Sequence, residues 1–557
     1  MLIVVWGLLP GLAWLLYTRL VYHRKKQFAA FPQLPPSLVW GHLKALHEFV
    51  LRGKRDRHIG RQGKINKESD SVFSDINKEL NHPPLFLLDT RPVQSPALCV
   101  VCRHDIADQV AGVSAKFPFS TPKAPGASHV LRPLLGATSI VSVESKQWKT
   151  LRQRFNPGFS HRHLVSLLPR ILGKVEQFHR ALDGYAVSGE EFAFGDLCVS
   201  LTLDVIGAVT MDADLHAQSN PDTQSEIVKA FRGLIRSYRS DEYHTWELSR
   251  LTRSHRRERL SRKLDTLLKE HIQRTFAAQQ QTRKIPTSPA SSRSILGLSL
   301  HGLDKLDNNL LQQTSDQLKT FLFAGHDTTS TVLQWAIYEL SRTPRALRAI
   351  RDELNSIFGT ESDSVHEKLL SAHSEELIRK MVYTSAVIRE TLRLYPPSGT
   401  ARYTPPGTGF CVQMDDGQSV CLDGLVIYNC ETIIHRDSAV YGPSSNIFTP
   451  ERWLEGTGNS TSIPATAWRP FERGPRSCIG QELANLQIRV ILACVVRRYE
   501  LFKVGLGEVV RGEDREGVLG EHGQFKVKSE VFNIMQVTAK PVDGMRMTVA
   551  FARDGLV

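Results

Sequence analysis

The chain has little cysteine for its length, and its eight cysteines show no spacing typical of a disulfide framework. This excludes the small secreted domains that depend on disulfide bonds, and it fits a reducing compartment such as the cytosol. Cys99 and Cys102 are closely spaced, but they lie in a short apolar segment after Pro96 that we interpret as a strand. Residues three apart on a strand point to opposite faces, so we expect no chelating pair there.

The sequence also lacks internal repeats and any DNA- or RNA-binding motif. Its 70 Lys and Arg residues exceed its 57 Asp and Glu residues, and the net charge of +13 is spread along the chain. A basic excess suits an acidic membrane surface or an acidic partner protein as well as nucleic acid. Because no such motif is present and the charge is spread along the chain, we expect no nucleic-acid partner.

The N-terminus lacks the signs of a cleaved signal peptide, because no basic residue precedes its apolar run and no small-residue cleavage site follows. Residues 1–18 carry no charge, and a basic cluster follows at residues 23–26. With Arg19 reaching toward the interface, about twenty residues can span the bilayer core. Lys and Arg mark the cytosolic side, so we predict a transmembrane signal-anchor over residues 1–22. The alternative is a buried N-terminal helix.

The rest of the chain reads as one large helical domain. The basic cluster and a proline-rich segment form a predicted hinge over residues 23–43, which proline would stiffen. Helical patterns dominate from about residue 145, whereas residues 84–102 and 400–430 are typical of short strands. We predict a mainly α fold with small β-sheets over residues 44–557, plus the N-terminal transmembrane helix.

One cysteine stands at a predicted junction between a loop and a helix. Cys478 is followed by Gly480 and by apolar positions at near-helical spacing. A helix N-terminus offers N–H groups and a partial positive charge, which stabilise a thiolate. Glycine lets the backbone approach a flat partner, and Arg476 can pair with a carboxylate. The loop suits a thiolate ligating the metal of a planar, acid-bearing cofactor; the alternative is a structural cysteine in a glycine turn.

A larger pattern surrounds this cysteine. Phe471, Gly474, Arg476, Cys478 and Gly480 give F-x-x-G-x-R-x-C-x-G. It resembles the haem-binding loop of the cytochrome P450 family, the haem-thiolate monooxygenases. The resemblance implies that Cys478 is the axial thiolate of iron in haem b, that Phe471 packs beside it and that Arg476 meets a haem propionate. Thiolate ligation favours O–O cleavage.

A second segment lies inside a predicted apolar helix that Pro344 ends. It places Gly325, Asp327, Thr328 and a further threonine together, which is locally disfavoured in a helix interior. Such conflict between local preference and context often marks a functional site. From the residues alone, the Thr328 hydroxyl has the alternative of bonding back to its own helix carbonyls.

The segment Ala-Gly-His-Asp-Thr-Thr resembles the oxygen-activating A-G-x-[DE]-T-[TS] of the same family. The resemblance implies that Asp327 and Thr328 relay protons and that Gly325 leaves room above the haem. His326 falls at the variable position of the pattern, and we assign it no catalytic role.

Glu390 and Arg393 lie three residues apart on one face of a predicted helix. The plain interpretation is a surface ion pair, although neighbouring leucines favour partial burial. The spacing resembles the E-x-x-R of the cytochrome P450 family, whose third member would be Arg452. The resemblance implies a structural trio behind the cysteine loop.

Two further arginines match propionate-binding positions of the family. Trp148 and Arg152 form W-x-x-x-R, one helical turn apart, and Arg402 lies in the strand-like segment after the E-x-x-R helix. The resemblance implies that all three contact the haem. We interpret His435 as an ordinary loop histidine.

The motifs come in family order from about residue 30 to residue 552, and they look most like filamentous-fungal members that tailor secondary metabolites. The resemblance implies an enzyme held in the endoplasmic reticulum membrane by one span in the lipid, with its catalytic domain in the cytosol. It would use O₂ to hydroxylate or epoxidise an apolar small molecule. Because no flavin- or nicotinamide-binding segment is present, a separate flavoprotein, NADPH-cytochrome P450 reductase, would supply the electrons.

Two alternatives remain at this point. One is a haem-thiolate isomerase or dehydratase that needs no external electrons, and the other is a membrane haem-binding sensor or carrier without turnover. Asp327 and Thr328 argue against both, because a proton relay serves neither.

Overall fold

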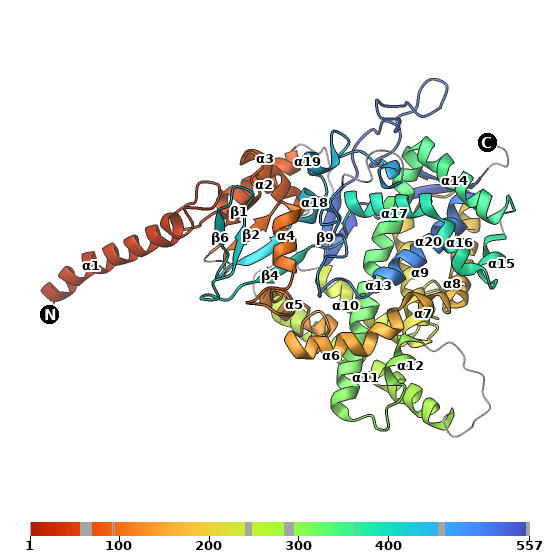
Figure 1. The fold of residues 1–557 in the computed structure, drawn as a ribbon, viewed down its shortest axis with the longest axis horizontal. Coiled ribbons are helices and arrows are strands. Elements are labelled where there is room, and N and C mark those ends of the chain that lie inside the picture. The colour runs from red at the N-terminus through yellow and green to blue at the C-terminus, as the bar shows by residue number, and fades with distance from the viewer. Residues whose placement is uncertain are drawn as a thin grey trace. The chain divides into compact units, whose positions relative to one another are not determined.

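The computed structural model describes residues 2–55, 69–91, 93, 95–239, 248–282, 294–361, 364–454 and 463–552. The chain folds as two units (Figure 1). The first comprises Met1–Pro125, Gly399–Ser445 and Ile463–Ser477, and the second comprises Gly126–Ser398, Asn446–Ser462 and Cys478–Val557. The mainly helical class with small sheets that the sequence predicts is confirmed.

The first unit contains a four-stranded sheet and short helices. Its helices are α1 (Leu2–Val21), η1 (Tyr22–Lys26), α2 (Leu43–Arg55), α3 (Ser69–Glu79), α4 (His104–Ala111), α18 (Glu431–Ile434) and α19 (Ser438–Tyr441). Its strands are β1 (Leu85–Leu88), β2 (Leu98–Val101), β4 (Thr400–Tyr403), β5 (Cys411–Gln413), β6 (Ser419–Cys421) and β7 (Val426–Asn429). The sheet order is β1-β2-β7-β4, with β2 and β7 parallel, and β5 and β6 form a separate hairpin. Both predicted strand regions are therefore confirmed.

Apolar side chains pack in two clusters that share the strands of this sheet. Cys99 belongs to one cluster and Cys102 to the other, because alternate residues of a strand face opposite ways. Both thiols are buried, and burial raises the pKa of Cys99 to about 12. The prediction that the two cysteines lie in a strand region with their side chains on opposite faces is confirmed.

The second unit is built from long helices. They are α5 (Pro125–Leu135), α6 (Ser145–Phe155), η2 (Asn156–Phe159), α7 (His161–Val165), α8 (Leu168–Ser188), α9 (Phe194–Met211), α10 (Glu226–Arg239), α11 (Leu248–Thr282), α12 (Ile295–Leu300), α13 (Asn308–Arg342), α14 (Pro344–Phe358), α15 (Ser364–Leu369), α16 (Ser374–Lys380), α17 (Val382–Leu394), η3 (Pro450–Trp453) and α20 (Gln481–Arg498). The strands are β3 (Phe192–Ala193), β8 (Tyr499–Lys503), β9 (Asn533–Gln536), β10 (Thr538–Pro541) and β11 (Arg546–Phe551), in a three-stranded sheet of order β3-β11-β8 and a β10-β9 pair.

Helix α13 is the central element of the second unit. Its 35 residues span about 52 Å, and it packs against α9, α11, α17, α20 and β10 (Figure 1). Its N-terminus is capped by the Asp307 side chain, which accepts a hydrogen bond of 2.7 Å from the backbone N–H of Leu310. It ends at Arg342, just before Pro344 starts α14, because proline cannot continue a helix.

The N-terminal helix α1 matches the predicted anchor in length. Its side chains from Leu12 to Leu20 are exposed although most of them are apolar. Across the described parts of the chain, length and composition single out only α9 as able to cross a membrane, and most of α9 is buried in the protein. The membrane span over residues 1–22 therefore stays a prediction.

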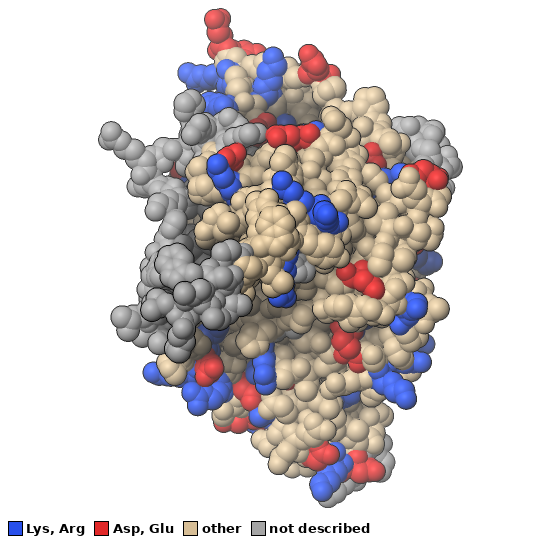
Figure 2. All heavy atoms as spheres, turned by 90° about the vertical axis from the view of Figure 1, so that its left-hand side faces the viewer, with Lys and Arg blue, Asp and Glu red and all other residues tan. Residues whose placement is uncertain are grey.

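Charge of both signs is mixed on the protein surface. On the face that Figure 2 shows, Lys and Arg side chains are interspersed with Asp and Glu side chains among the described residues. On this face the distribution agrees with the spread of charge along the sequence.

The basic segment after α1 is fixed to the first unit by one arginine. Arg24 is buried, and its guanidinium donates to the carboxylate of Asp89 at 2.6 Å. The same group donates to the backbone carbonyls of Leu38 (3.1 Å), Val39 (2.9 Å) and Arg91 (2.7 Å). The predicted hinge is thus fastened to the turn after β1 by a buried ion pair and three backbone bonds.

Replacing Arg24 by Met should lower the stability of this junction. Asp89 would keep its bond to Arg91 at 2.8 Å, so the expected loss is about 1–3 kcal/mol, the cost of unmet buried acceptors. Urea denaturation and limited proteolysis of residues 27–42 would measure it. The control is Lys25→Met, because Lys25 is exposed; equal behaviour of the two variants would contradict the role of Arg24.

Candidate functional site

The segment before Cys478 is braced within the first unit by a buried arginine. The Arg469 guanidinium donates to the Glu472 carboxylate at 2.8 Å and to the carbonyls of His104 (3.0 Å) and Ala107 (3.1 Å) in α4. Its backbone N–H donates to Nε2 of His435 at 3.0 Å. His435, which the sequence suggests is an ordinary loop residue, is therefore a buried part of this brace.

The backbone conformation and close packing at Gly474 explain why the loop has glycine at that position. Its φ is +74°, and a Cβ there would lie 2.4 Å from the carbonyl oxygen of Ala111. In the same loop Arg476 is buried, and Phe471 lies 6.1 Å from the ring of Trp468. The contacts predicted for Phe471 and Arg476 with a haem stay predictions.

Cys478 is the first residue of the second unit after this loop. It is exposed and lies two residues before Gly480, the N-cap of the 18-residue helix α20. A Cβ on Gly480 would lie 3.8 Å from the Cys478 sulfur, in ordinary contact. The helix end contributes a partial positive charge, which favours a thiolate.

A guanidinium of α6 lies close enough to Cys478 for their charges to interact. Burial lowers the pKa of Arg152, and the Cys478 thiolate opposes that effect. Trp148, one turn earlier on α6, is buried and anchors this helix. The structure therefore brings together three predicted residues: the thiol, Arg152 and Trp148.

This donor set fits a haem held by a thiolate. Five of the other cysteines are buried, and the remaining two, Cys411 and Cys421, lie in the β5–β6 hairpin. Cys478 is thus the exposed sulfur at a helix end, with a half-buried arginine able to meet an acidic group.

The predicted propionate ligand Arg402 belongs to β4 of the first unit. Its side chain is fully buried, and Nη1 donates to the Thr121 carbonyl at 3.1 Å. A role toward haem stays a prediction for this residue.

In α13, the Thr328 hydroxyl donates to the carbonyl of Ala324 at 2.7 Å. This is the bond back to the helix that the sequence leaves open as an alternative, and Thr328 remains half-buried. The neighbouring Thr329 hydroxyl accepts a bond of 3.3 Å from Gln487 of α20. The relay segment is therefore tied to the helix that follows Cys478.

Gly325 has a packing role in the structure. A Cβ there would lie 2.5 Å from Cδ1 of Ile206 in α9. Glycine therefore allows α9 and α13 to approach closely, which accounts for the residue without reference to the haem; the predicted role above the haem stays untested.

The carboxylate of Asp327 is buried and paired with two residues of β10. The Thr538 hydroxyl donates to Oδ2, and the Lys540 ammonium contacts Oδ1. Burial alone would raise the pKa of Asp327, but the charge of Lys540, together with the hydrogen bond from Thr538, holds it below its usual range. The sequence gives no sign of either β10 partner, because both lie far along the chain in an ordinary strand.

His326 lies beside this carboxylate with a defined tautomer. Nδ1 is 2.7 Å from the Leu322 carbonyl, which only accepts, so Nδ1 carries the proton and Nε2 is left as an acceptor. Nε2 is 3.7 Å from Oδ1 of Asp327. Burial lowers the pKa of His326, and Lys540 lowers it further, so the imidazole is neutral near pH 7.

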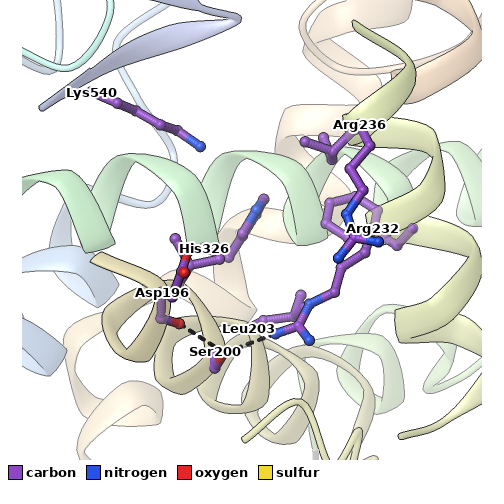
Figure 3. A pocket seen from close by; sticks show the side chains of 10 residues that line it. Asp196, Ser200, Leu203, Arg232, Arg236, His326 and Lys540 are labelled. Carbon is purple, nitrogen blue, oxygen red and sulfur yellow. Dashed lines mark hydrogen bonds between the residues drawn. The ribbon is translucent and has the colours of Figure 1, made fainter. Parts of the chain in front are cut away.

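His326 and Lys540 both line a cavity of about 250 Å³ (Figure 3). The other charged residues that line it are Asp196 of α9 and Arg232 and Arg236 of α10, so cations outnumber the carboxylate. Arg232 donates to the Ser200 hydroxyl at 2.8 Å, which ties α10 to α9. The cavity therefore reaches Lys540, which contacts Asp327 from β10, and His326, its neighbour on α13.

The predicted structural trio is assembled around one buried carboxylate. Glu390 accepts from Arg393 at 2.8 and 2.9 Å and from Nε of Arg452 at 3.0 Å. The Trp453 indole (2.9 Å) and the Thr449 backbone N–H (3.0 Å) complete its shell. All three charged side chains are buried, so the surface ion pair considered from the sequence is not what the structure shows.

Most of this chain is similar in sequence to known proteins. The cytochrome P450 family model matches residues 60–528. A cytochrome P450 monooxygenase of Aspergillus aculeatus, acrF, is 32% identical over 84% of this chain and 94% of its own. Another, polC of Polytolypa hystricis, is 28% identical over 87% and 84%, and macH of Penicillium terrestre is 27% identical over 70% and 76%.

Replacing Glu390 by Gln should be strongly destabilising, because two buried guanidinium groups would lose their only shared carboxylate. The expected loss is about 3–5 kcal/mol, the range for breaking a buried ion pair. The matched control is Glu376→Gln, whose pair with Lys380 is exposed and screened by solvent and therefore contributes little. Yield of folded protein and the urea midpoint would measure both; a Glu390→Gln variant as stable as the control would disprove the role.

Proposed function

Because the chain belongs to the cytochrome P450 family, which consists of haem-thiolate monooxygenases, we propose that Cys478 is the thiolate ligand of its haem and that the enzyme oxidises an apolar small molecule. The observation that carries the assignment is the exposed Cys478 sulfur at the N-terminal end of α20, beside Arg152. When bound, the haem supplies oxygen-activating chemistry, which a thiolate ligand directs toward O–O cleavage.

The protein's own part in this proposal includes holding the thiolate. The Arg469 brace and Gly474 fix the loop that precedes Cys478. The end of α20 and the Arg152 charge favour the ionised sulfur. Arg152, Trp148, Arg402 and Arg476 are the proposed contacts of the propionates, with Phe471 and Gly480 beside the ring.

Asp327 is the proposed proton donor, with Thr328 as the second member of the relay. A carboxylate whose pKa is lowered stays ionised at rest and releases a proton quickly after receiving one. Lys540 contacts it and also lines the cavity, which supports our proposal that protons reach Oδ1 from the cavity side. His326 offers a neutral acceptor nitrogen on the same wall. These contacts support delivery from the cavity side of α13.

The cellular setting follows the same family membership. The proposed enzyme is attached to the endoplasmic reticulum membrane by α1, with its catalytic domain in the cytosol, and receives electrons from NADPH-cytochrome P450 reductase. The exposed apolar side chains of α1 and the Arg24 junction support attachment at this end of the chain. Similarity to monooxygenases of three fungi supports a substrate from secondary metabolism.

The ligand assignment is tested by the difference spectrum of the reduced protein with carbon monoxide. Wild type should show the strongly red-shifted Soret band of thiolate-bound haem, and Cys478→Ser should lose it. Cys494→Ser is the control, because Cys494 is buried within α20 and should leave the band unchanged. A red-shifted band that survives in Cys478→Ser would overturn the assignment.

The proton path is tested by Lys540→Met. Without the ammonium, burial should raise the pKa of Asp327, so proton delivery should slow by about tenfold or more. The measurements are the solvent deuterium isotope effect on turnover and the hydrogen peroxide released per O₂ consumed; both should rise. The control is Lys526→Met, an exposed lysine of the same unit. Unchanged isotope effect and peroxide release in Lys540→Met would exclude this path.

A further inference from the structure

The hairpin of β5 and β6 places two cysteines directly opposite each other. In its antiparallel register Cys411 faces Cys421, and Gln413 faces Ser419. Backbone hydrogen bonds of 2.9 Å join Leu422 to Phe410 and Met414 to Gln418. Hydrogen-bonded and non-hydrogen-bonded pairs alternate along antiparallel strands, so the cysteines form a non-hydrogen-bonded pair, in which side chains are closest.

Both thiols lie on the solvent side of the hairpin. Cys411 and Cys421 are exposed. Val412, the next residue after Cys411 on β5, points the other way and is fully buried in the core of the first unit. The next pair on the same face is already in contact, because the Gln413 amide donates to the Ser419 hydroxyl at 3.2 Å. Opposed side chains on this face therefore touch each other across the strands.

The backbone spacing of such a pair suits a disulfide. Non-hydrogen-bonded pairs have Cα atoms about 4.5 Å apart, and disulfides are found at Cα separations of roughly 4.4–6.8 Å. The register of the hairpin therefore places the two cysteines at a spacing at which disulfides form. The other exposed cysteine is Cys478, the proposed haem ligand, and the remaining five are buried.

We propose that Cys411 and Cys421 form a surface dithiol that hydrogen peroxide converts to an intrachain disulfide and that trivalent arsenicals chelate. One thiolate attacks peroxide, breaking its O–O bond to give a sulfenic acid and, with one proton, water. The second thiolate then attacks that sulfur, forms the S–S bond and releases the sulfenic oxygen as a second water. Two thiols are oxidised and one peroxide is reduced. The chemistry does not depend on haem.

The surroundings of the pair make the reaction responsive to pH. Burial raises the pKa of Cys421, and the nearby Asp423 carboxylate and Cys411 add to the rise. Because the thiolate is the reactive form, oxidation should be slow near neutral pH and accelerate as pH rises.

The test uses the full-length protein and one tryptic peptide. Cleavage after Arg402 and Arg436 yields residues 403–436, which hold Cys411, Cys421 and Cys430. After peroxide treatment of the folded protein, denaturation and alkylation, wild type should give this peptide with two hydrogens lost and a single alkylated thiol at Cys430. Diamide oxidises thiols but leaves methionine, here Met414 of the same peptide, unchanged. It should give the same product. Recovery of three alkylated thiols after both oxidants would overturn the proposal.

Matched variants separate the pair from general thiol reactivity. Cys430→Ser should keep the cross-link, because Cys430 is buried, and Cys411→Ser should abolish it and leave Cys421 open to dimedone as a sulfenic acid. Phenylarsine oxide should protect both thiols from alkylation in wild type and protect neither single variant. Equal protection of Cys421 in wild type and Cys411→Ser would rule out bidentate binding.

Discussion

The buried carboxylate of Glu390 is the interaction on which the helical unit depends. It binds Arg393 within α17 and Arg452 in η3, and it also accepts from Trp453 and a backbone N–H. Two guanidinium groups and one carboxylate are removed from water together. The fold tolerates this only because both carboxylate oxygens accept hydrogen bonds. The helix that carries Glu390 packs against both α13 and α20, so its position sets the frame for the relay segment and for the helix after Cys478.

The same solution recurs at three other buried charges. Arg469 is compensated by Glu472, Asp327 by Lys540 and Arg24 by Asp89. Arg469 and Glu472 brace one loop, Lys540 joins β10 to α13, and Arg24 joins η1 to the turn after β1. Charge pairing thus fastens the irregular segments to the scaffold, and hydrophobic packing alone would leave those segments less well fixed.

The sequence predicted what is local in the chain. The thiolate loop, the helix with Asp327 and Thr328 and the pair Glu390–Arg393 are visible because their members are a few residues apart and their spacing has a physical reason. The end of α13 before Pro344 and the strands around Cys99 follow from backbone chemistry in the same way. The overall class, mainly helical with small sheets, follows from these periodicities.

What the sequence did not predict depends on distant partners. Thr538 is 211 residues from Asp327, and Arg469 is 362 residues from Ala107, and neither looks unusual in its own segment. His326 was set aside because its position in the pattern is variable, yet its place on the cavity wall depends on β10 and α10. The packing of Gly325 against Ile206 is likewise visible only in the fold, because the two residues are far apart in the sequence.

The pairing of Asp327 with β10 has a consequence for the order in which the protein acquires its structure. During synthesis Asp327 leaves the ribosome 211 residues before Thr538, a delay of roughly ten to forty seconds at ordinary elongation rates. Until the last strands exist, burying this carboxylate in α13 would leave a charge without its cation. The native surroundings of Asp327 are therefore complete only after β10 has been synthesised, long after α13 itself.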